Sequence, residues 1–137
     1  MAVRIDVGTR FPAYATATGR VLLANAPAPW LERYLSRVNL LPLTEHTISS
    51  VASLRGAIDV VRREGYAYVD QELDSSLRAL AVPIHDRAGD VVAAMSASTH
   101  TRNPQDAAQI ADLLDEHLRP RSPRGCPRTT SSSSGCG

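Results

Sequence analysis

The sequence predicts an α+β domain in which an antiparallel sheet is flanked by helices. Apolar residues recur at helical spacing in several segments, and β-rich runs stand between those segments. Two of these runs flank a glycine-containing turn, which is the pattern of a β-hairpin. A chain of 137 residues that is 43% hydrophobic is long enough for one packed core. We expect the order strand, helix, helix, strand, strand, strand, helix, with one further short helix between the first two helices.

The first part of the domain is expected to contain a strand and then a helix. Val3–Val7 alternates apolar and polar residues, as a half-buried strand does. Ala13–Ala26 has helical periodicity, and either Thr16 or Thr18 can cap its start. Two prolines end this helix, and the second of them can open a short helix over Trp30–Val38, before a connector.

A second strong helix has clear signals at both ends. Ser50 or Ser53 can cap its start, and Gly65 follows two arginines at the position where helices usually end. The apolar stripe of this helix consists of Leu54, Ile58 and Val61. The boundary at Gly65 is therefore the clearest one in the sequence.

The sheet is expected to follow this helix. Tyr66–Val69 and Leu77–Ile84 have the composition of strands, and Pro83 with the turn after it is expected to halt the second. Val91–Ser98 then pairs back as the partner strand of the hairpin. Amphipathic spacing predicts a last helix over Pro104–Leu118.

Residues 119–137 differ in composition from the rest of the chain. They hold four arginines and no acid, so with a net charge of +1 overall the remaining residues carry −3. A nucleic-acid binder normally shows clustered positive charge on its folded face, so the mildly acidic charge of the predicted folded part argues against direct DNA contact. We expect a domain over residues 1–118 and a disordered tail rich in Arg, Pro and Ser over 119–137. An out-of-frame or vector-derived tail and a natural extension are both open.

The location expected from the sequence is the cytoplasm. No apolar run approaches the length of a membrane span, and the first residues do not have the form of a signal peptide. Both cysteines lie in the tail, so the predicted domain has no disulfide framework and no thiolate metal site.

The sequence offers little for catalysis. No histidine has a metal-ligand spacing, and no nucleophile elbow, phosphate-binding loop or dinucleotide motif is present. Asp70, Glu72 and Asp74 form one acidic cluster between predicted strands, where a solvated loop is favoured over an acid–base pair. We therefore expect no enzyme, no catalytic residue, no metal and no cofactor. A hydrolase or isomerase that uses Asp70 and Glu72 is a remote alternative.

Small and hydroxylated residues crowd the start of the first predicted helix, over residues 13–19, and they allow two interpretations. Helix N-termini present free N–H groups that hold carboxylates or phosphates, and threonine hydroxyls add donors to such a site. Small side chains also suit close packing of a helix on a sheet. From this segment alone, packing is slightly favoured over ligand binding.

Three segments of the sequence match motifs of one known family. Val7–Ala24 is similar to the stretch VG-x-R-x-P-x-x-x-T-x-x-G-[KR]-x-LLA, and Leu43–Ile48 is similar to LT-x-x-TI. Gly65–Ala94 resembles GYA-x-x-x-[EQ]E…GLR-x-[IL]AVP…G-x-VVAA, with Ser76 where the family usually has glycine. Together these segments resemble the C-terminal domain of IclR-type bacterial transcription regulators, over about residues 3–118 and in the same order. The third segment is most similar to the branch that regulates aromatic-acid catabolism through the β-ketoadipate pathway.

This resemblance implies the sensing part of a two-part regulator. In the family, an N-terminal winged helix-turn-helix binds operator DNA, and a C-terminal GAF-like domain binds a small metabolite and mediates oligomerisation. We expect an N-terminally truncated GAF-like domain, because the winged helix, the linker helix and the opening elements of the sensing domain have no counterpart in this sequence. The partners implied are a small organic acid effector (an aromatic or keto acid), further copies in a dimer or tetramer, and DNA only through the absent domain. The alternative is an oligomerisation fragment without a functional pocket.

The resemblance also assigns an effector pocket position by position. Its residues would be Thr16, Ala17, Thr18 and Gly19 at the helix start, Glu72, Ser76, Leu77, Arg78 and Ala79 on the loop and strand, and Ser96 and Ser98 on the hairpin partner. Arg78 can contact the ligand, pair with Glu72 or lie in solvent. Glu72 is expected to hold the loop as a hydrogen-bond acceptor. The two stretches, residues 13–19 and 72–79, would then form two sides of a cavity suited to a small anion.

Overall fold

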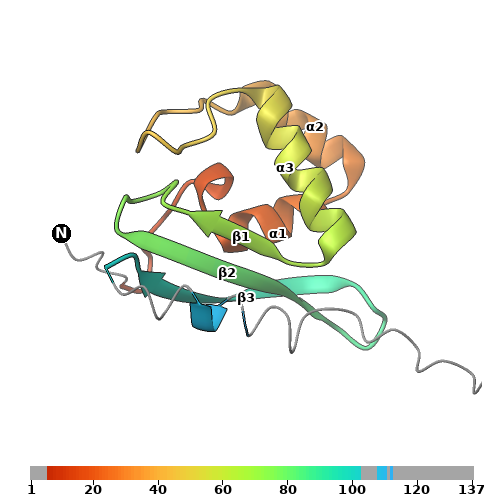
Figure 1. Cartoon of the computed structure of the whole chain (residues 1–137). Coiled ribbons are helices and arrows are strands. Elements are labelled where there is room, and N and C mark those ends of the chain that lie inside the picture. The colour runs from red at the N-terminus through yellow and green to blue at the C-terminus, as the bar shows by residue number, and fades with distance from the viewer. Residues whose placement is uncertain (1–5, 103–107, 111, 113–137) are drawn as a thin grey trace, which may run out of the picture.

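A computed structural model describes residues 6–102, 108–110 and 112 of the chain. It shows a three-stranded antiparallel sheet of order β1-β2-β3, with three α-helices on one face of that sheet (Figure 1). The elements are the 3-10 turn η1 (Ala13–Ala15), the helices α1 (Ala17–Asn25), α2 (Ala28–Arg37) and α3 (Val51–Glu64), and the strands β1 (Ala67–Asp70), β2 (Leu77–His85) and β3 (Val91–His100). The predicted α+β class is confirmed.

The start of α1 differs from the prediction. The sequence predicts one helix over Ala13–Ala26, whereas the chain forms the turn η1 and then α1, because the backbone of Thr16 is extended at φ −118° and ψ 145°. The Thr16 hydroxyl accepts a hydrogen bond from the Gly19 N–H (3.2 Å), so Thr16 rather than Thr18 is the cap. A side chain at Gly19 would place its Cβ 2.4 Å from the Cα of Ala13. Glycine therefore lets α1 fold back against the turn that precedes it.

The other two helices begin and end close to their predicted positions. Pro29 lies in the first turn of α2, where its missing N–H breaks no helical hydrogen bond. α3 is capped by the Ser50 hydroxyl and ends at Gly65, whose φ of 81° is the left-handed conformation that glycine favours. The Arg62 Nε donates to the carbonyl of Ala24 (2.8 Å) and so ties α3 to the end of α1.

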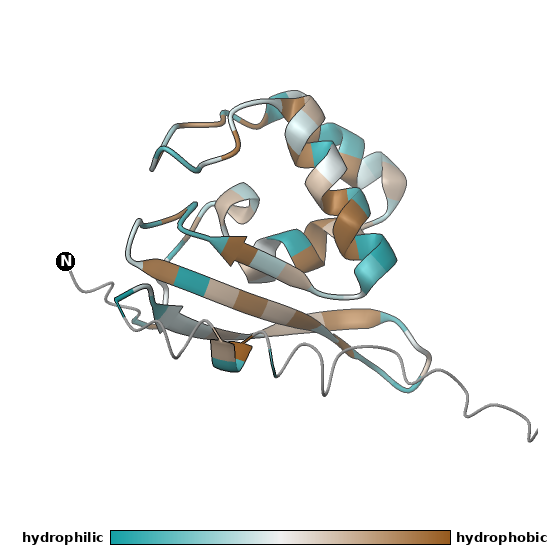
Figure 2. Ribbon diagram, viewed as in Figure 1, coloured by the Kyte–Doolittle hydropathy of each residue, from teal (hydrophilic) through white to brown (hydrophobic). Residues whose placement is uncertain are grey.

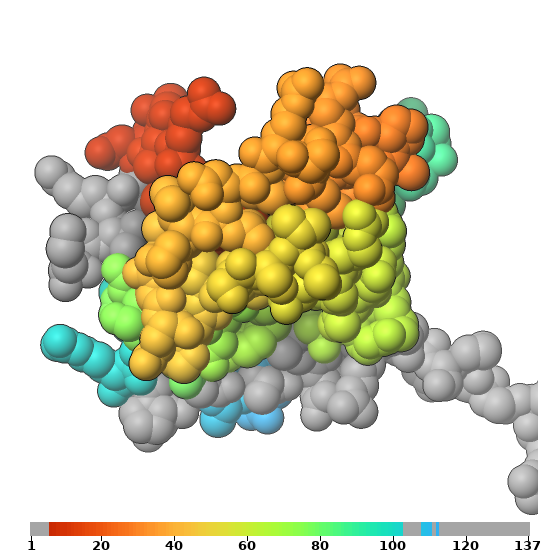
Figure 3. Space-filling model, turned by 90° about the horizontal axis from the view of Figure 1, so that it is seen from above, coloured from red at the N-terminus to blue at the C-terminus, as the bar shows by residue number. Residues whose placement is uncertain are grey.

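The core lies between the helices and the sheet. α1 contacts α3 on one side and all three strands on the other. Leu54 and Ile58 of the predicted stripe and Val21 of α1 have no exposed surface, and hydrophobic residues follow β1 and β2 beneath them (Figure 2). Seen from above, α2, α3 and the connection between them cover much of the molecule (Figure 3). The start of α1 is thus held in place from both sides.

β2 is the central strand and is longer than predicted. It continues through Pro83 to His85, one residue beyond the predicted end at Ile84, so the turn and not Pro83 ends the strand. Pro83 lies beyond Ala81, the last residue of β2 that pairs with β1, and a strand with one free edge tolerates a residue without an N–H. The turn that follows has Gly89 at φ 89°, and β3 pairs back as the predicted hairpin partner.

Several predicted elements lie partly or wholly outside the described residues. Only Asp6 and Val7 of the strand predicted over Val3–Val7 are described, and they belong to a turn in which the Thr9 N–H donates to the Asp6 carbonyl (3.0 Å). Of the helix predicted over Pro104–Leu118, residues 108–110 and 112 are described, and these are helical. The predicted tail over 119–137 lies outside the described residues.

Candidate functional site

A cavity of about 220 Å³ lies between the start of α1 and the sheet. Four parts of the chain build it: the segment before α1, the first turn of α1, the loop between β1 and β2, and the three strands. Its lining residues are Phe11, Ala15, Thr16, Ala17, Thr18, Val69, Leu73, Leu77, Ala79, Ser96 and Ser98. The stretches 13–19 and 72–79 therefore meet at this cavity.

The strands contribute the floor of the cavity through alternation. Residues two apart on a strand face the same side, so Leu77 and Ala79 of β2 face α1 together, as do Ser96 and Ser98 of β3. The register places Val69, Ala79 and Ser98 side by side across the three strands. The floor is consequently apolar under β1 and β2 and carries hydroxyl groups at β3.

The start of α1 supplies hydrogen-bond donors to the opposite wall. The Thr16 hydroxyl is used by the fold, since it donates to the Pro12 carbonyl (3.3 Å) and accepts from Gly19. The backbone N–H groups of Ala17 and Thr18 have no acceptor within the described part of the chain. They lie at the positive end of the helix dipole. Among the lining residues there is no charged side chain, so this wall offers neutral donors.

Seven of the eleven predicted pocket residues line the cavity. They are Thr16, Ala17, Thr18, Leu77, Ala79, Ser96 and Ser98. The four that do not line it are Gly19, Glu72, Ser76 and Arg78. Four further residues line the cavity: Ala15 and Leu73 belong to the predicted stretches 13–19 and 72–79 but were not assigned individually, and Phe11 and Val69 lie outside them. Of these, Val69 could have been found, because it belongs to a predicted strand beside Leu77–Ile84.

Arg78 faces the side of the sheet opposite to the cavity. It stands between Leu77 and Ala79 on β2, and alternation turns it away from α1. Its Nε donates to Asp70 Oδ1 (2.8 Å), a partner outside the three alternatives that the sequence suggested. Burial by itself raises the pKa of the Asp70 carboxyl, but the hydrogen bonds from Arg78 and Gln71, together with the nearby positive charge of Arg78, hold that pKa below its ordinary value.

Ser76 and Gly19 serve the backbone instead of the cavity. The N–H and the hydroxyl of Ser76 both donate to Asp74 Oδ1 (2.8 and 2.6 Å), and these bonds lower the pKa of the Asp74 carboxyl. Ser76 does not have a positive φ, so serine fits where the related family usually has glycine. Gly19 provides the close approach to Ala13 described above. For Gly19, the packing interpretation of the small residues is the one that the structure supports.

The loop between β1 and β2 is fastened by two threonines from the predicted Leu43–Ile48 motif. The Thr44 hydroxyl donates to the Gln71 carbonyl (2.6 Å), and the Thr47 hydroxyl donates to the Glu72 carbonyl (2.7 Å). The Thr47 hydroxyl also accepts from the Thr44 N–H (2.8 Å), so the two threonines hold the loop together. This loop carries Leu73 into the cavity wall.

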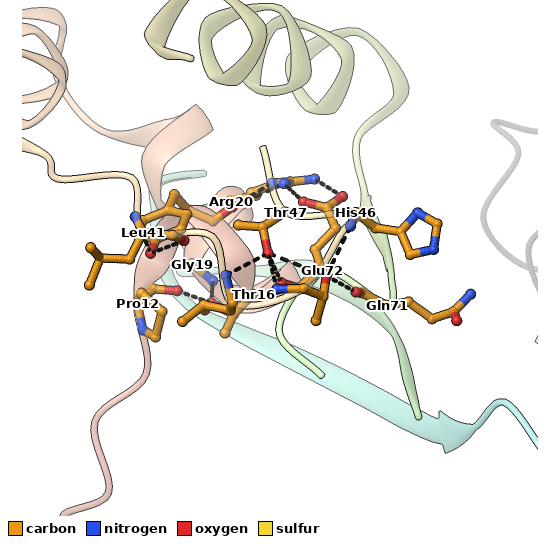
Figure 4. A network of polar contacts seen from close by, with 12 residues as sticks. Pro12, Thr16, Gly19, Arg20, Leu41, His46, Thr47, Gln71 and Glu72 are labelled. Atoms are coloured by element: carbon orange, nitrogen blue, oxygen red, sulfur yellow. Dashed lines mark hydrogen bonds and ion pairs between the residues drawn. The ribbon is translucent and has the colours of Figure 1, made fainter. Parts of the chain in front are cut away.

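Glu72 is held by Arg20, a residue that the sequence did not single out. The Arg20 Nη1 donates to Glu72 Oε1 (3.0 Å) and its Nη2 donates to Glu72 Oε2, as Figure 4 shows. The side chains are 5% and 14% exposed, so this is a buried ion pair. The expectation that Glu72 is an acceptor that holds the loop agrees with this contact. Its guanidinium partner comes from α1 and not from β2.

Within residues 6–102, 108–110 and 112, no three His, Cys, Asp or Glu side chains lie close enough together to hold a metal ion. The helices of this part are also too short or too polar to cross a bilayer.

The chain has clear relatives among known proteins. The family model "Bacterial transcriptional regulator IclR C-terminal" matches residues 1–119. The Pca regulon regulatory protein of Pseudomonas putida is 45% identical over 100 residues, which are 73% of this chain and 34% of that protein. The chain thus spans about a third of the length of this curated relative.

Two solved structures have a similar fold. A transcriptional regulator from Rhodococcus sp. RHA1 matches with a TM-score of 0.75 and 42% identity, over 86% of this chain and 46% of that one. The inducer-binding domain of PobR from Acinetobacter, a double mutant in complex with 3-hydroxybenzoic acid, matches with a TM-score of 0.70 and 30% identity. That match covers 80% of this chain and 65% of the other.

Proposed function

This chain belongs to the IclR family of bacterial transcriptional regulators, whose C-terminal domain it matches, and from this premise we propose that it senses a small organic acid in the cavity between α1 and the sheet. The family is one of transcription regulators and not of enzymes. One observation carries the proposal. The cavity combines unused donors at the start of α1 with hydroxyl groups on β3 and an apolar wall between them.

A carboxylate suits the end of the cavity that α1 forms. The N–H groups of Ala17 and Thr18 and the Thr18 hydroxyl can all donate to it, and the helix dipole favours a negative charge at this position. Arg78 is paired with Asp70 on the other face, and no arginine is among the described residues that line the cavity. The acid is therefore expected to be bound by neutral donors.

The remainder of the ligand suits the apolar part of the cavity. Phe11, Leu73 and Leu77 offer it a hydrophobic surface, and Ser96 and Ser98 can bond a hydroxyl or second carboxyl group at the far side. A dry cavity of about 150 Å³ can hold benzene, so a volume of about 220 Å³ accommodates one ring, or a short keto-acid chain, with its polar groups.

One solved relative favours an aromatic acid over a keto acid. The similar PobR domain contains 3-hydroxybenzoic acid. A single ring with two polar groups fits the class of ligand that the cavity suggests. We therefore rank hydroxybenzoates first among the candidate effectors.

Thermal unfolding in the presence of organic acids tests this function. The acids to titrate are 3-hydroxybenzoate, 4-hydroxybenzoate and protocatechuate, with β-ketoadipate, pyruvate and glyoxylate as the keto acids. An effector at a hundred times its Kd stabilises the native state by about 2.7 kcal/mol, so the melting temperature should rise with concentration. If none of these acids raises it, the proposed function is wrong.

Two serine-to-alanine variants, one in the cavity and one outside it, provide a matched comparison. Ser98→Ala removes a hydroxyl from the cavity, whereas Ser36→Ala removes an exposed hydroxyl from α2 that donates to the Arg33 carbonyl. The loss of one hydrogen bond of about 0.5–1.5 kcal/mol should weaken binding by roughly two- to twelvefold for Ser98→Ala. Binding by the Ser36→Ala variant should match that of the unmodified chain.

The wider role follows from the same premise. We propose that effector binding shifts the arrangement of sensing domains in a cytoplasmic homo-oligomer, and that a winged helix-turn-helix passes this shift to DNA. Residues 1–118 would form the sensing domain. Size-exclusion chromatography tests the assembly: a monomer at all concentrations contradicts it. A stable oligomer that ignores every acid favours the alternative of an interaction fragment without a functional pocket.

A further inference from the structure

Arg20 joins three segments of the chain at one buried point. Its Nη1 and Nη2 donate to the two carboxylate oxygens of Glu72, while its Nε and Nη2 donate to the Tyr14 carbonyl (3.1 and 3.0 Å). Arg20 itself stands on α1, Tyr14 belongs to η1, and Glu72 belongs to the loop between β1 and β2. One guanidinium thereby fixes the relative positions of η1, α1 and this loop.

Each of these three segments also supplies residues to the cavity wall. η1 contributes Ala15, the first turn of α1 contributes Thr16, Ala17 and Thr18, and the loop contributes Leu73. Arg20 and Glu72 do not line the cavity. Their contacts lie behind the wall, where they can set its geometry without touching a ligand.

The threonine contacts do not duplicate this role. Thr44 and Thr47 hold the carbonyls of Gln71 and Glu72, but they belong to the connection between α2 and α3 and make no hydrogen bond to α1. Among the described residues, Arg20–Glu72 is the side-chain hydrogen bond that links α1 to the loop. The spacing between the donors of α1 and the apolar side chain of Leu73 therefore depends on this pair.

We propose that Arg20 and Glu72 are positioning residues for the effector: their ion pair sets the distance between the donor wall and the apolar wall of the cavity. This inference rests on the proposed function, because it concerns the same cavity. It adds that affinity for an acid depends on two residues that never touch the acid. The planar fork of arginine is needed, since Nε, Nη1 and Nη2 reach the Tyr14 carbonyl and the two carboxylate oxygens from three separate nitrogens, whereas lysine has a single nitrogen from which to donate.

The first test is a comparison of affinities with 3-hydroxybenzoate as the probe. Calorimetric titration is done well below the melting temperature of every variant, so that all of the protein is folded. Glu72→Gln should weaken binding on the order of tenfold, an effect within reach of residues outside a ligand contact. Arg20→Lys keeps the charge and should weaken binding in the same direction. Affinity unchanged in both variants overturns the proposal.

Two control variants separate positioning from stability. Glu32→Gln breaks the exposed Arg55–Glu32 pair, neither member of which lines the cavity, and should leave affinity unchanged. Leu35→Ala removes a core side chain of α2 that is 4% exposed and does not line the cavity, so it should lower the melting temperature with little change in affinity. If Leu35→Ala weakens binding as much as Glu72→Gln, the effect belongs to stability and the proposal is wrong.

A second readout needs no ligand. The Leu77 N–H donates to the Asp74 carbonyl and the Gln71 N–H donates to the Leu77 carbonyl, so these two amides report on the loop. Hydrogen exchange at both should become faster in Glu72→Gln, whereas exchange in α3 should not change. If the unmodified chain binds no acid, the proposed function is wrong. The hydrogen-exchange rates of the two amides still test whether Glu72 positions the loop. Equal exchange in the two proteins overturns that role.

Discussion

Gly19→Ala should destabilise the protein although alanine is the better helix former. The new Cβ would lie 2.4 Å from both the Cα and the carbonyl oxygen of Ala13 and 2.6 Å from the Thr16 Oγ1. Two of these obstacles are backbone atoms that cannot rotate away, so a cost of about 3 kcal/mol, the upper end for overpacking, is expected. Alanine recovers about 1 kcal/mol through its helix propensity. The free energy of unfolding should therefore fall by about 2 kcal/mol.

The matched control for this variant is Gly56→Ala. Gly56 lies in the middle of α3, and a Cβ there would meet no atom within 4 Å, so alanine should stabilise by up to about 1 kcal/mol. Circular dichroism followed during thermal unfolding measures both variants. At roughly 4 °C per kcal/mol, Gly19→Ala should lower the melting temperature by about 8 °C and Gly56→Ala should raise it. If Gly19→Ala stabilises as Gly56→Ala does, then the close approach of α1 to η1 does not exist.

Three further predictions concern the core, a helix end and acid stability. Leu54→Ala should lower the free energy of unfolding by about 2–5 kcal/mol in urea titration, because Leu54 has no exposed surface; a loss below 1 kcal/mol would contradict its place in the core. Gly65→Ala should cost about 1 kcal/mol in the same assay, since alanine is strained at a φ of 81°, and Gly65→Asn should cost less. The Asp70 carboxyl has a lowered pKa in the folded state, so it contributes stability above its unfolded pKa that is lost as the pH falls through the folded one. Arg78→Met should remove this part of the acid dependence in pH-dependent unfolding, and an unaltered acid limb would show that the Arg78–Asp70 pair does not form.

Local signals predict most of the fold. The capping hydroxyl of Ser50, the apolar stripe of α3 and Gly65 lie within one short stretch, so the bounds of this helix can be read from the sequence. The start of α1 is marked less clearly, because Thr16 and Thr18 are both possible caps and the helical spacing already begins at Ala13. Its break at Thr16 depends on the close approach of Gly19 to Ala13, which is a contact made by packing and not by helical periodicity.

The candidate cavity could be predicted only in part. The family resemblance indicates the helix start and β2, but it presents Leu77, Arg78 and Ala79 as one consecutive group. Successive side chains on a strand point to opposite faces, so Arg78, between Leu77 and Ala79, could have been excluded from the predicted pocket. The Arg20–Glu72 pair joins residues 52 positions apart, and no local pattern in a single sequence can indicate such a contact.

Alternation along β2 also separates two tasks that could otherwise conflict. Leu77 and Ala79 can be substituted to change the shape of the cavity, while Arg78 continues to pair with Asp70 on the opposite face of the sheet. The same geometry makes the strand intolerant of a change in chain length. One residue inserted just before Leu77 would move every side chain of β2 to the opposite face of the sheet. The Arg78 guanidinium would then face α1 and place a positive charge at the cavity.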